Sequence, residues 1–283
     1  MEAVDWLQRL LLSLEGEGEP PQWKGGLVRI SKQQSTQFWN FLCKVLTHKK
    51  RREGLELMGD KGFLACVFPE VARLAGVLQP EAFHPEGDAL RHTVLTVANL
   101  REPTCAQAVA ALLHDVAKPH TFAVTDRIRF NQHNIFGVEI IRSLARRLST
   151  PDHIAELATF VCRKHMLLLD VRKMRLPRFA RLISSPHFES LLKIWEADIA
   201  ASHGDTEDLN YVRRVAAILR RIPAPKRWLH PLSVAAARKL GLSADEAVRA
   251  VREIELLALQ GKVKTKQQAI NHILRHRETE PTD

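Results

Sequence analysis

Residues 110–119 read AALLHDVAKP, a stretch that joins an apolar helix to two polar side chains at its end. The small and apolar residues that precede them predict a buried helix over Cys105–Ala117, which Pro119 stops. Burying the adjacent His114 and Asp115 costs free energy unless a partner compensates them. That partner is either a neighbouring ring or backbone N–H, which Asp115 accepts, or a metal ion that both side chains bind.

Other histidines and an aspartate that could bind a metal ion lie on or beside other expected helices. An isolated histidine on a helix is more often a core or surface residue than a ligand, but a set of six is harder to explain in that way. A helical bundle collects metal ligands by this arrangement, one or two from each helix. The six candidates are His92, His114, Asp115, His133, His165 and Asp198.

Helical periodicity dominates the rest of the chain, and we predict an all-α protein with one small β-hairpin at Thr121–Phe130 and a helical C-terminal tail. Asp88 and Thr150 are expected helix caps, the latter followed by Pro151, and Ser243 with Glu246 forms a capping box. Linkers are expected over Glu15–Gly26 and Ile222–Pro231. The expected helices are Ala3–Leu14, Thr36–Leu46, Arg51–Met58, Phe68–Leu78, Asp88–Asn99, Cys105–Ala117, His133–Leu148, Thr150–Lys164, Leu176–Ile183, Pro186–Ser202, Glu207–Arg220, Leu232–Leu240, Ala244–Leu259 and Lys266–Arg275.

The composition is that of an ordinary globular protein: 283 residues, 45% of them hydrophobic and 26% charged. No segment approaches the ~20 apolar residues that span a bilayer, and the acidic residues within Met1–Leu14 argue against a signal peptide. We therefore expect a soluble, cytoplasmic protein without membrane contact. The cysteines lack any CxxC spacing and are expected to be reduced core residues rather than disulfides or zinc ligands; they are Cys43, Cys66, Cys105 and Cys162.

The basic excess is large, with 42 Lys and Arg against 32 Asp and Glu. Such an excess favours polyanionic partners, nucleic acids or phosphorylated small molecules. It concentrates between Arg163 and Arg181, where only Asp170 is acidic, and between Arg213 and Lys239, where no acid occurs. A solvated helix face explains such runs about as well as an electropositive binding surface does. Aromatic residues, only 6% of the chain, give no support to a base-stacking platform.

His92, the His114–Asp115 pair and Asp198 fit the H…HD…D pattern of the HD superfamily of metal-dependent phosphohydrolases, which the sequence resembles. The segments FPEVARLAGVLQPEAFHPEGDALRHTVLTV, LLHDVAKPHTF, IRFNQHNIFGVEI and WEADIAASHGD are similar to the HD region in the C-terminal half of bacterial tRNA nucleotidyltransferases (CCA-adding enzymes) and related poly(A) polymerases. The resemblance covers about Arg51–Arg275. It implies an HD domain over 51–222 and a transferase-like tail over 223–283, and the residue pattern predicts N-terminal helices and a linker over 1–50.

The resemblance implies that His92, His114, Asp115 and Asp198 hold a divalent ion. Two imidazoles and two carboxylates suit Mn, Fe, Ni, Co or Zn better than Mg, although Mg remains possible. His133 and His165 match positions that bind a second metal in some HD enzymes or that contact phosphate; we favour the one-metal version. Metal-activated water would hydrolyse a phosphoester, with Asp115 as a proton acceptor and Lys118 as a charge on phosphate. Arg163 and Lys164 would bind further substrate phosphate.

Two departures separate the chain from the transferases. Residues 1–50 contain neither the Gly-Ser turn nor the Asp-x-Asp pair of a catalytic head, so nucleotide addition by this chain alone is not expected. Ala117 replaces the usual glycine, and SADEAVRA replaces a Gly-Pro-rich turn in the tail. We expect a phosphohydrolase or phosphodiesterase acting on a nucleotide, a 2′,3′-cyclic phosphate or an RNA end. The alternatives are a non-catalytic RNA- or tRNA-binding module, and a partner subunit for a separate nucleotidyltransferase.

Overall fold

The computed structural model describes residues 2–220 and 232–279 and confirms a mostly helical protein, 65% helix, with one two-stranded antiparallel hairpin among these residues. The expected linker Ile222–Pro231 lies outside the described residues. In chain order the elements are α1 (Ala3–Leu14), α2 (Lys32–Thr47), α3 (Arg51–Asp60), α4 (Leu64–Val67), α5 (Pro69–Ala72), α6 (Ala89–Asn99), α7 (Cys105–Leu113), α8 (Lys118–Thr121), β1 (Phe122–Val124), β2 (Ile128–Phe130), α9 (His133–Arg147), α10 (Asp152–Lys164), η1 (His165–Leu168), η2 (Val171–Lys173), α11 (Leu176–Ile183), α12 (Phe188–Ala201), α13 (Glu207–Arg220), α14 (Val234–Arg238), α15 (Ala244–Leu259) and α16 (Lys266–Thr279).

The chain forms two compact units. The first comprises residues 1–166 and 189–206, and the second comprises residues 167–188 and 207–283. The three segments expected from the sequence, 1–50, 51–222 and 223–283, stay a prediction. No helix in the described ranges is long and apolar enough to cross a bilayer.

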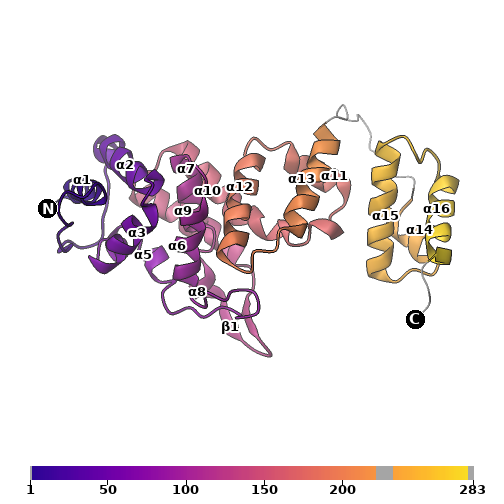
Figure 1. Cartoon of the computed structure of the whole chain (residues 1–283), viewed down its shortest axis with the longest axis horizontal. Helices are drawn as coiled ribbons and strands as arrows, with labels where there is room; N and C mark the ends of the chain where they lie inside the picture. Colours follow the sequence, from indigo (N-terminus) through magenta and orange to yellow (C-terminus); the bar gives the residue numbers. More distant parts are fainter. Residues whose placement is uncertain (1, 221–231, 280–283) are drawn as a thin grey trace. The chain divides into compact units, whose positions relative to one another are not determined.

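Helix α7 is the centre of the first unit. Its side chains from Ala108 to Leu113 are all buried, and it packs against α2, α6 and α10. Thr104 begins it with a capping box, because its hydroxyl accepts from the backbone N–H of Gln107 while the Gln107 side chain accepts from the N–H of Thr104. Figure 1 shows α6, α7, α9 and α10 gathered in one cluster, with α1–α3 beside them. The C-terminal end of α7 therefore lies within a packed bundle of helices.

The expected end of this helix was placed too late. Helix α7 stops at Leu113, and Pro119 lies inside the short helix α8 instead of terminating α7. Proline is tolerated there because a residue in the first helical turn needs no intrahelical N–H bond. His114 and Asp115 consequently lie in the turn between the two helices.

Two other expected elements differ in the structure. The helix expected over Phe68–Leu78 is reduced to α5, and a loop follows in which Gly76 adopts a φ of +78°. Thr150 does not cap α10: Pro151 occupies the cap position, and the buried Thr150 hydroxyl has no hydrogen-bond partner. The hairpin is confirmed, with Phe122 opposite Phe130. The capping box at Ser243 is also confirmed.

The expectation that all four cysteines are reduced is wrong for two of them. Cys43 in α2 and Cys105 at the start of α7 form a disulfide, whereas Cys66 and Cys162 are free thiols. The packing of α2 on α7 brings the two Cα atoms to 5.0 Å although 62 residues separate them in the chain. Sequence spacing carries no signal for such a long-range pair.

The second unit has its own apolar cluster, built around Val251 and Ile254 of α15 and joined by residues of α14 and α16. Its basic residues are partly neutralised by acids from other segments: Arg172 pairs with Glu207 and Asp208, and Arg175 pairs with Glu255. The acid-poor stretch that begins at Arg163 therefore does not remain unopposed once the chain has folded.

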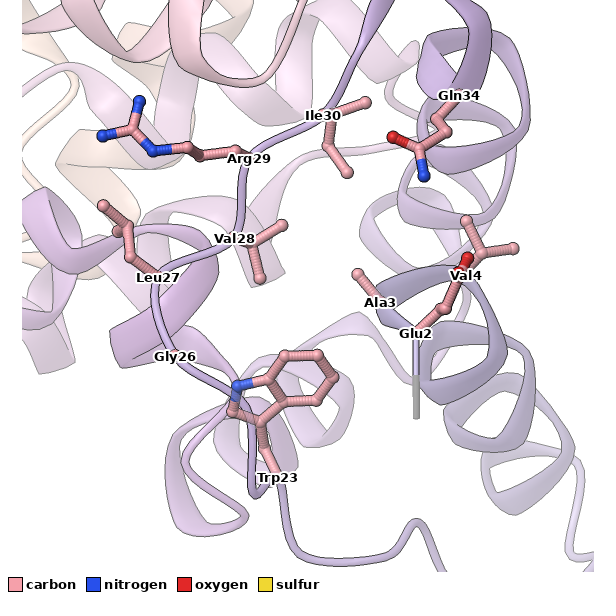
Figure 2. Close-up of a pocket in the computed structure, with 10 residues that line it drawn as sticks. All are labelled: Glu2, Ala3, Val4, Trp23, Gly26, Leu27, Val28, Arg29, Ile30 and Gln34. Carbon is pink, nitrogen blue, oxygen red and sulfur yellow. The ribbon is translucent and has the colours of Figure 1, made fainter.

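A hollow near the N-terminus of the first unit lies between the start of α1 and the extended segment 26–30. Figure 2 shows the indole of Trp23 at one side of it and Val4 at another. None of the six candidate ligands is among its lining residues. The site of interest lies elsewhere in the unit.

Candidate metal centre

The six candidate ligands all lie in the first unit, and the structure brings them together. Four helices and the turn after α7 supply them: His92 comes from the first turn of α6, His133 begins α9, His165 directly follows α10, and Asp198 lies in α12. All four histidines and Asp115 are buried, and the Asp198 side chain is 21% exposed. Side chains separated by up to 106 positions thus share one small volume.

The carboxylate of Asp115 occupies the middle of this group. Its Oδ2 lies 3.1 Å from His114 Nε2 and 2.6 Å from Lys118 Nζ. Its Oδ1 lies 3.2 Å from His133 Nε2 and 3.5 Å from His165 Nε2. One carboxylate therefore faces two sets of imidazoles, one with each oxygen.

His92 is held between two other carboxylates. Its Nε2 lies 2.8 Å from Asp198 Oδ1, and its Nδ1 lies 2.6 Å from Glu86 Oε1. Glu86 Oε1 also lies 2.9 Å from His84 Nδ1. Glu86, in the loop before α6, and Asp198, in α12, thus contact opposite edges of the His92 ring.

The other three rings are oriented by backbone carbonyls. The Nδ1 of His114 lies 2.7 Å from the Ala111 carbonyl oxygen. The Nδ1 of His133 lies 2.8 Å from the Phe130 carbonyl oxygen, and that of His165 lies 2.8 Å from the Cys162 carbonyl oxygen. A carbonyl oxygen only accepts, so each Nδ1 donates its proton to the carbonyl and each ring presents its Nε2 toward Asp115. Metal-binding histidines are commonly oriented in this way.

The pKa values of His92 and Glu86 reflect their mutual contact. Burial lowers the pKa of His92, but its contacts with Asp198 and Glu86 outweigh this and raise it to about 9. Burial raises the pKa of Glu86, but its contacts with His92, with its own backbone N–H and with His84 bring it down to about 2. Without a cation, His92 therefore keeps its second ring proton well above neutral pH.

The remaining groups also depart from their ordinary values. Burial raises the pKa of Asp115, but the charges of His114 and Lys118 hold it well below its usual range. Asp198 follows the same pattern, since its contact with His92 outweighs burial and lowers its pKa. Burial lowers the pKa of His165, whereas the nearby Asp115 raises that of His114 against the effect of burial. Carboxylates that stay ionised next to imidazoles are the donors that a divalent cation requires.

The donor set fits a transition-metal site. Within the described residues, three groups have ligand atoms within 4.8 Å of one another: His92, His114 and Asp115; Asp115, His133 and His165; and His84, Glu86 and His92. Both ring nitrogens of His92 and Nε2 of His114 are buried without a hydrogen bond of regular geometry. Mixed imidazole and carboxylate ligands suit Mn, Fe, Co, Ni or Zn. One cation would satisfy Nε2 of His92 and Nε2 of His114 at once.

The residues expected to bind substrate lie at two places. Lys118 is only 6% exposed, and its ammonium contacts Asp115, the Gln79 side chain and the Phe130 ring. Arg163 and Lys164 occupy the last turn of α10, directly before His165. The Arg163 carbonyl accepts from the Asn134 amide. The phosphate-binding roles of all three stay a prediction.

Sequence reasoning missed three residues of this site, namely Gln79, His84 and Glu86. They come from the loop between α5 and α6, beyond the end of the expected helix Phe68–Leu78, so no helical periodicity pointed to them. A signal was present in HPEGD at positions 84–88, where a histidine and a glutamate stand six to eight residues before His92. Their significance became visible only when the loop was seen to fold back onto α6.

Comparison with known proteins agrees with this geometry. Residues 70–187 match the HD domain family. The multifunctional CCA proteins of Neisseria meningitidis serogroup C (strain 053442) and Neisseria gonorrhoeae (strain NCCP11945) are each 36% identical over 140 residues, 48% of this chain and 33% and 34% of their own lengths. The multifunctional CCA protein of Aliivibrio salmonicida (strain LFI1238) is 29% identical over 192 residues, 64% of this chain and 46% of its own.

The chain thus spans less than half the length of these relatives. The matched residues 70–187 contain five of the six converging side chains, and only Asp198 lies beyond them. Residues 70–187 therefore carry an HD-domain match, the first unit holds a candidate buried His/Asp metal site, and the chain has partial similarity to multifunctional CCA proteins.

Proposed function

We propose that this chain is a metal-dependent phosphohydrolase. The observation that carries the proposal is the Asp115 carboxylate, which lies between His114 on one side and the His133–His165 pair on the other. Three imidazole Nε2 atoms directed at one buried carboxylate form an arrangement that bound cations would stabilise. Phosphoester hydrolysis is the reaction that such a cluster serves in the HD superfamily that the sequence resembles.

The geometry supports two ions rather than the single ion favoured from the sequence. His92, His114, Asp115 and Asp198 would hold the first, and Asp115, His133 and His165 would hold the second. The Nε2 atoms of His133 and His165 lie 3.1 Å apart. When both Nδ1 atoms carry the protons, a cation bound by both Nε2 atoms would offset the repulsion between their lone pairs. The ions would be Mn, Fe, Ni, Co or Zn, with Mg less suited to nitrogen ligands.

A divalent cation bound here supplies a Lewis acid for the phosphoryl oxygen and lowers the pKa of water toward neutrality. The chain's own residues then have separate tasks. Asp115 accepts a proton from the attacking water, and Lys118 keeps that carboxylate ionised through its 2.6 Å contact. The backbone carbonyls behind His114, His133 and His165 fix the ring orientations, so that little rearrangement is needed during the reaction.

For the substrate we propose a nucleotide, a 2′,3′-cyclic phosphate or an RNA end. The similarity to multifunctional CCA proteins supports an RNA or tRNA substrate for this chain. Arg163 and Lys164, next to His165, would hold substrate phosphate as cations. The alternative partner is a separate nucleotidyltransferase. We also propose a cytoplasmic location, where such substrates occur.

The test is metal content together with hydrolysis. The purified chain, stripped and reloaded with Mn²⁺, should bind two ions and hydrolyse phosphodiester substrates, and the double variant His133→Ala/His165→Ala should bind one. The variant His153→Ala, on the outer part of α10, is the matched control and should bind two. A single ion in the unaltered chain would restore the one-metal site. No ion and no hydrolysis would contradict the proposed function and leave an RNA-binding module, detectable by salt-dependent RNA affinity.

A further inference from the structure

Glu86 is not one of the four ligands assigned to the first ion, but it contacts one of them, His92. Its side chain is 4% exposed, and its Oε1 lies 2.6 Å from His92 Nδ1. On the opposite edge of the same ring, His92 Nε2 faces Asp198. An imidazole that binds a cation through Nε2 must keep its proton on Nδ1, and an ionised carboxylate can only accept that proton in a hydrogen bond.

The backbone holds Glu86 in this position. The loop closes on itself through a hydrogen bond from Gln79 N–H to the Gly87 carbonyl and one from Ala89 N–H to the Val77 carbonyl. Asp88 secures the junction, since its carboxylate accepts from the N–H groups of Gly76 and Arg91 and thereby caps α6. Glu86 is thus fixed to the same helix start that carries His92.

His84 supports the carboxylate from the solvent side. Its Nδ1 lies 2.9 Å from the same Oε1 atom, and its ring packs edge-on against that of His92 with centroids 4.9 Å apart. The side chain of His84 is 21% exposed, whereas that of His92 is fully buried. A chain of contacts therefore leads from a half-buried histidine through Glu86 and His92 to Asp198.

Resting on the metal site proposed above, we propose that Glu86 is a positioning residue that holds the Nδ1 proton of His92, so that Nε2 is presented to the ion, and that His84 buttresses Glu86. Carboxylates behind ligating histidines fix the tautomer and raise the basicity of the ligand, and their loss typically costs 10- to 100-fold in metal affinity. The rival assignment for the same atoms is a cation bound directly by His84, Glu86 and His92. That assignment would require both nitrogens of His92 to be ligands.

The experiment uses the full chain loaded with Zn²⁺, which is diamagnetic. Zinc affinity is measured by competition with a chelator, and the His92 tautomer by long-range ¹H–¹⁵N spectra of the imidazoles. Glu86→Leu should weaken the binding of the first ion roughly 10- to 100-fold and remove the protected Nδ1 proton of His92. Glu86→Gln, whose amide oxygen still accepts, should stay within roughly five-fold of the unaltered chain.

Glu81→Gln is the matched control, because Glu81 is an exposed carboxylate in the same loop; it should change neither quantity. Should Glu86→Leu fail to fold, Glu86→Asp, which withdraws the carboxylate by one methylene, is expected to show the same loss. Unchanged affinity and tautomer in both variants would overturn the positioning role. Loss of one whole equivalent of zinc in Glu86→Gln would overturn it in favour of a direct ligand. If the unaltered chain binds no zinc, the proposed function itself fails, which is a separate result.

Discussion

Asp115 is the residue on which both ion positions depend. It lies within 3.5 Å of three imidazole nitrogens and of the Lys118 ammonium. Asp115→Asn keeps the size of the side chain but removes the charge that balances these groups, and breaking such a buried pair typically costs about 3–5 kcal/mol. We expect the variant to lose metal uptake at both positions and to unfold at lower urea concentration, as measured by metal analysis and urea titration.

The control is Asp126→Asn, in the turn of the hairpin. Asp126 is exposed and pairs only with its neighbours Thr125 and Arg129 among the contacts seen. It should retain the full metal content. Metal binding by Asp115→Asn equal to that of Asp126→Asn would remove Asp115 from the site.

His92 gives the metal-free chain a stability that depends on pH. Its folded pKa of about 9 exceeds the ordinary value of 6.5, so the stabilisation is complete below pH 6.5 and is lost as the pH rises through 9. A shift of this size corresponds to about 3 kcal/mol, and the raised pKa of His114 acts in the same direction. Urea unfolding of the metal-free chain at pH 6, 8 and 10 should show the decline.

The same linkage predicts two further results. Metal affinity should rise over this pH range, because the ion must displace the proton from His92. On the acid side, the lowered pKa of Glu86 gives stability that is present above its ordinary value of 4.5 and is lost toward pH 2. A metal-free His92→Gln variant should lose most of the alkaline decline; an unchanged decline would assign it to other groups.

At the level of single residues, the sequence was enough to select the six candidate ligands. The six ligand candidates were chosen because His and Asp recur near helix ends, and the structure places all six together. Glu86 and His84 were missed because their role depends on a loop that folds back, which helical periodicity does not encode. The expected contact of Lys118 with phosphate stays a prediction. Its burial against Asp115 and Gln79 is a tertiary property that local sequence does not reveal.

Among the elements, the close approach of α9 and α10 sets the spacing of His133 and His165. Gly137 of α9 permits it, because a Cβ at this position would lie 2.4 Å from Cys162 Sγ. Gly137→Ala gains up to about 1 kcal/mol of helix propensity, but overpacking costs about 1–3 kcal/mol. We expect a net loss of unfolding free energy together with weaker binding of the second ion, measured by urea unfolding and zinc competition.

The adjacent cysteine provides the control for this prediction. In a Cys162→Ala background the overlap disappears, so Gly137→Ala should become neutral or stabilising there. The two substitutions form a double-mutant cycle whose coupling reports the contact between the helices. Additive effects would show that Gly137 is retained for another reason.

The boundaries of elements were less predictable than their existence. Helices such as α1, α3, α6 and α13 were located from apolar spacing and caps, because their local signals agree with their packing. Pro119 was misread because proline stops a helix that precedes it but also starts one that follows, and only the turn at His114–Asp115 separates these cases. Thr150 was misread because a favourable cap residue does not oblige the chain to use it.

For the first unit as a whole, residues before position 50 are part of the packed structure. Helices α1 and α2 pack on each other and on α3, and the side chain of Trp39 in α2 donates to the Leu148 carbonyl at the end of α9. Arg147 contacts the carbonyls of Val28 and Val67 and pairs with Glu70. This segment is therefore a packed part of the first unit.

The disulfide ties this segment covalently to the helix that ends at the metal centre. Closing a loop between Cys43 and Cys105, 62 residues apart, restricts the unfolded chain and should stabilise the fold by about 4 kcal/mol in the loop-entropy treatment. Titration of the denatured, unreduced chain should find two thiols, Cys66 and Cys162. Cys43→Ala/Cys105→Ala should unfold at lower urea by that amount, whereas Cys66→Ala, which touches no disulfide, should change little. Four titratable thiols, or equal stability of the double variant and the unaltered chain, would show that α2 and α7 are held together by packing alone.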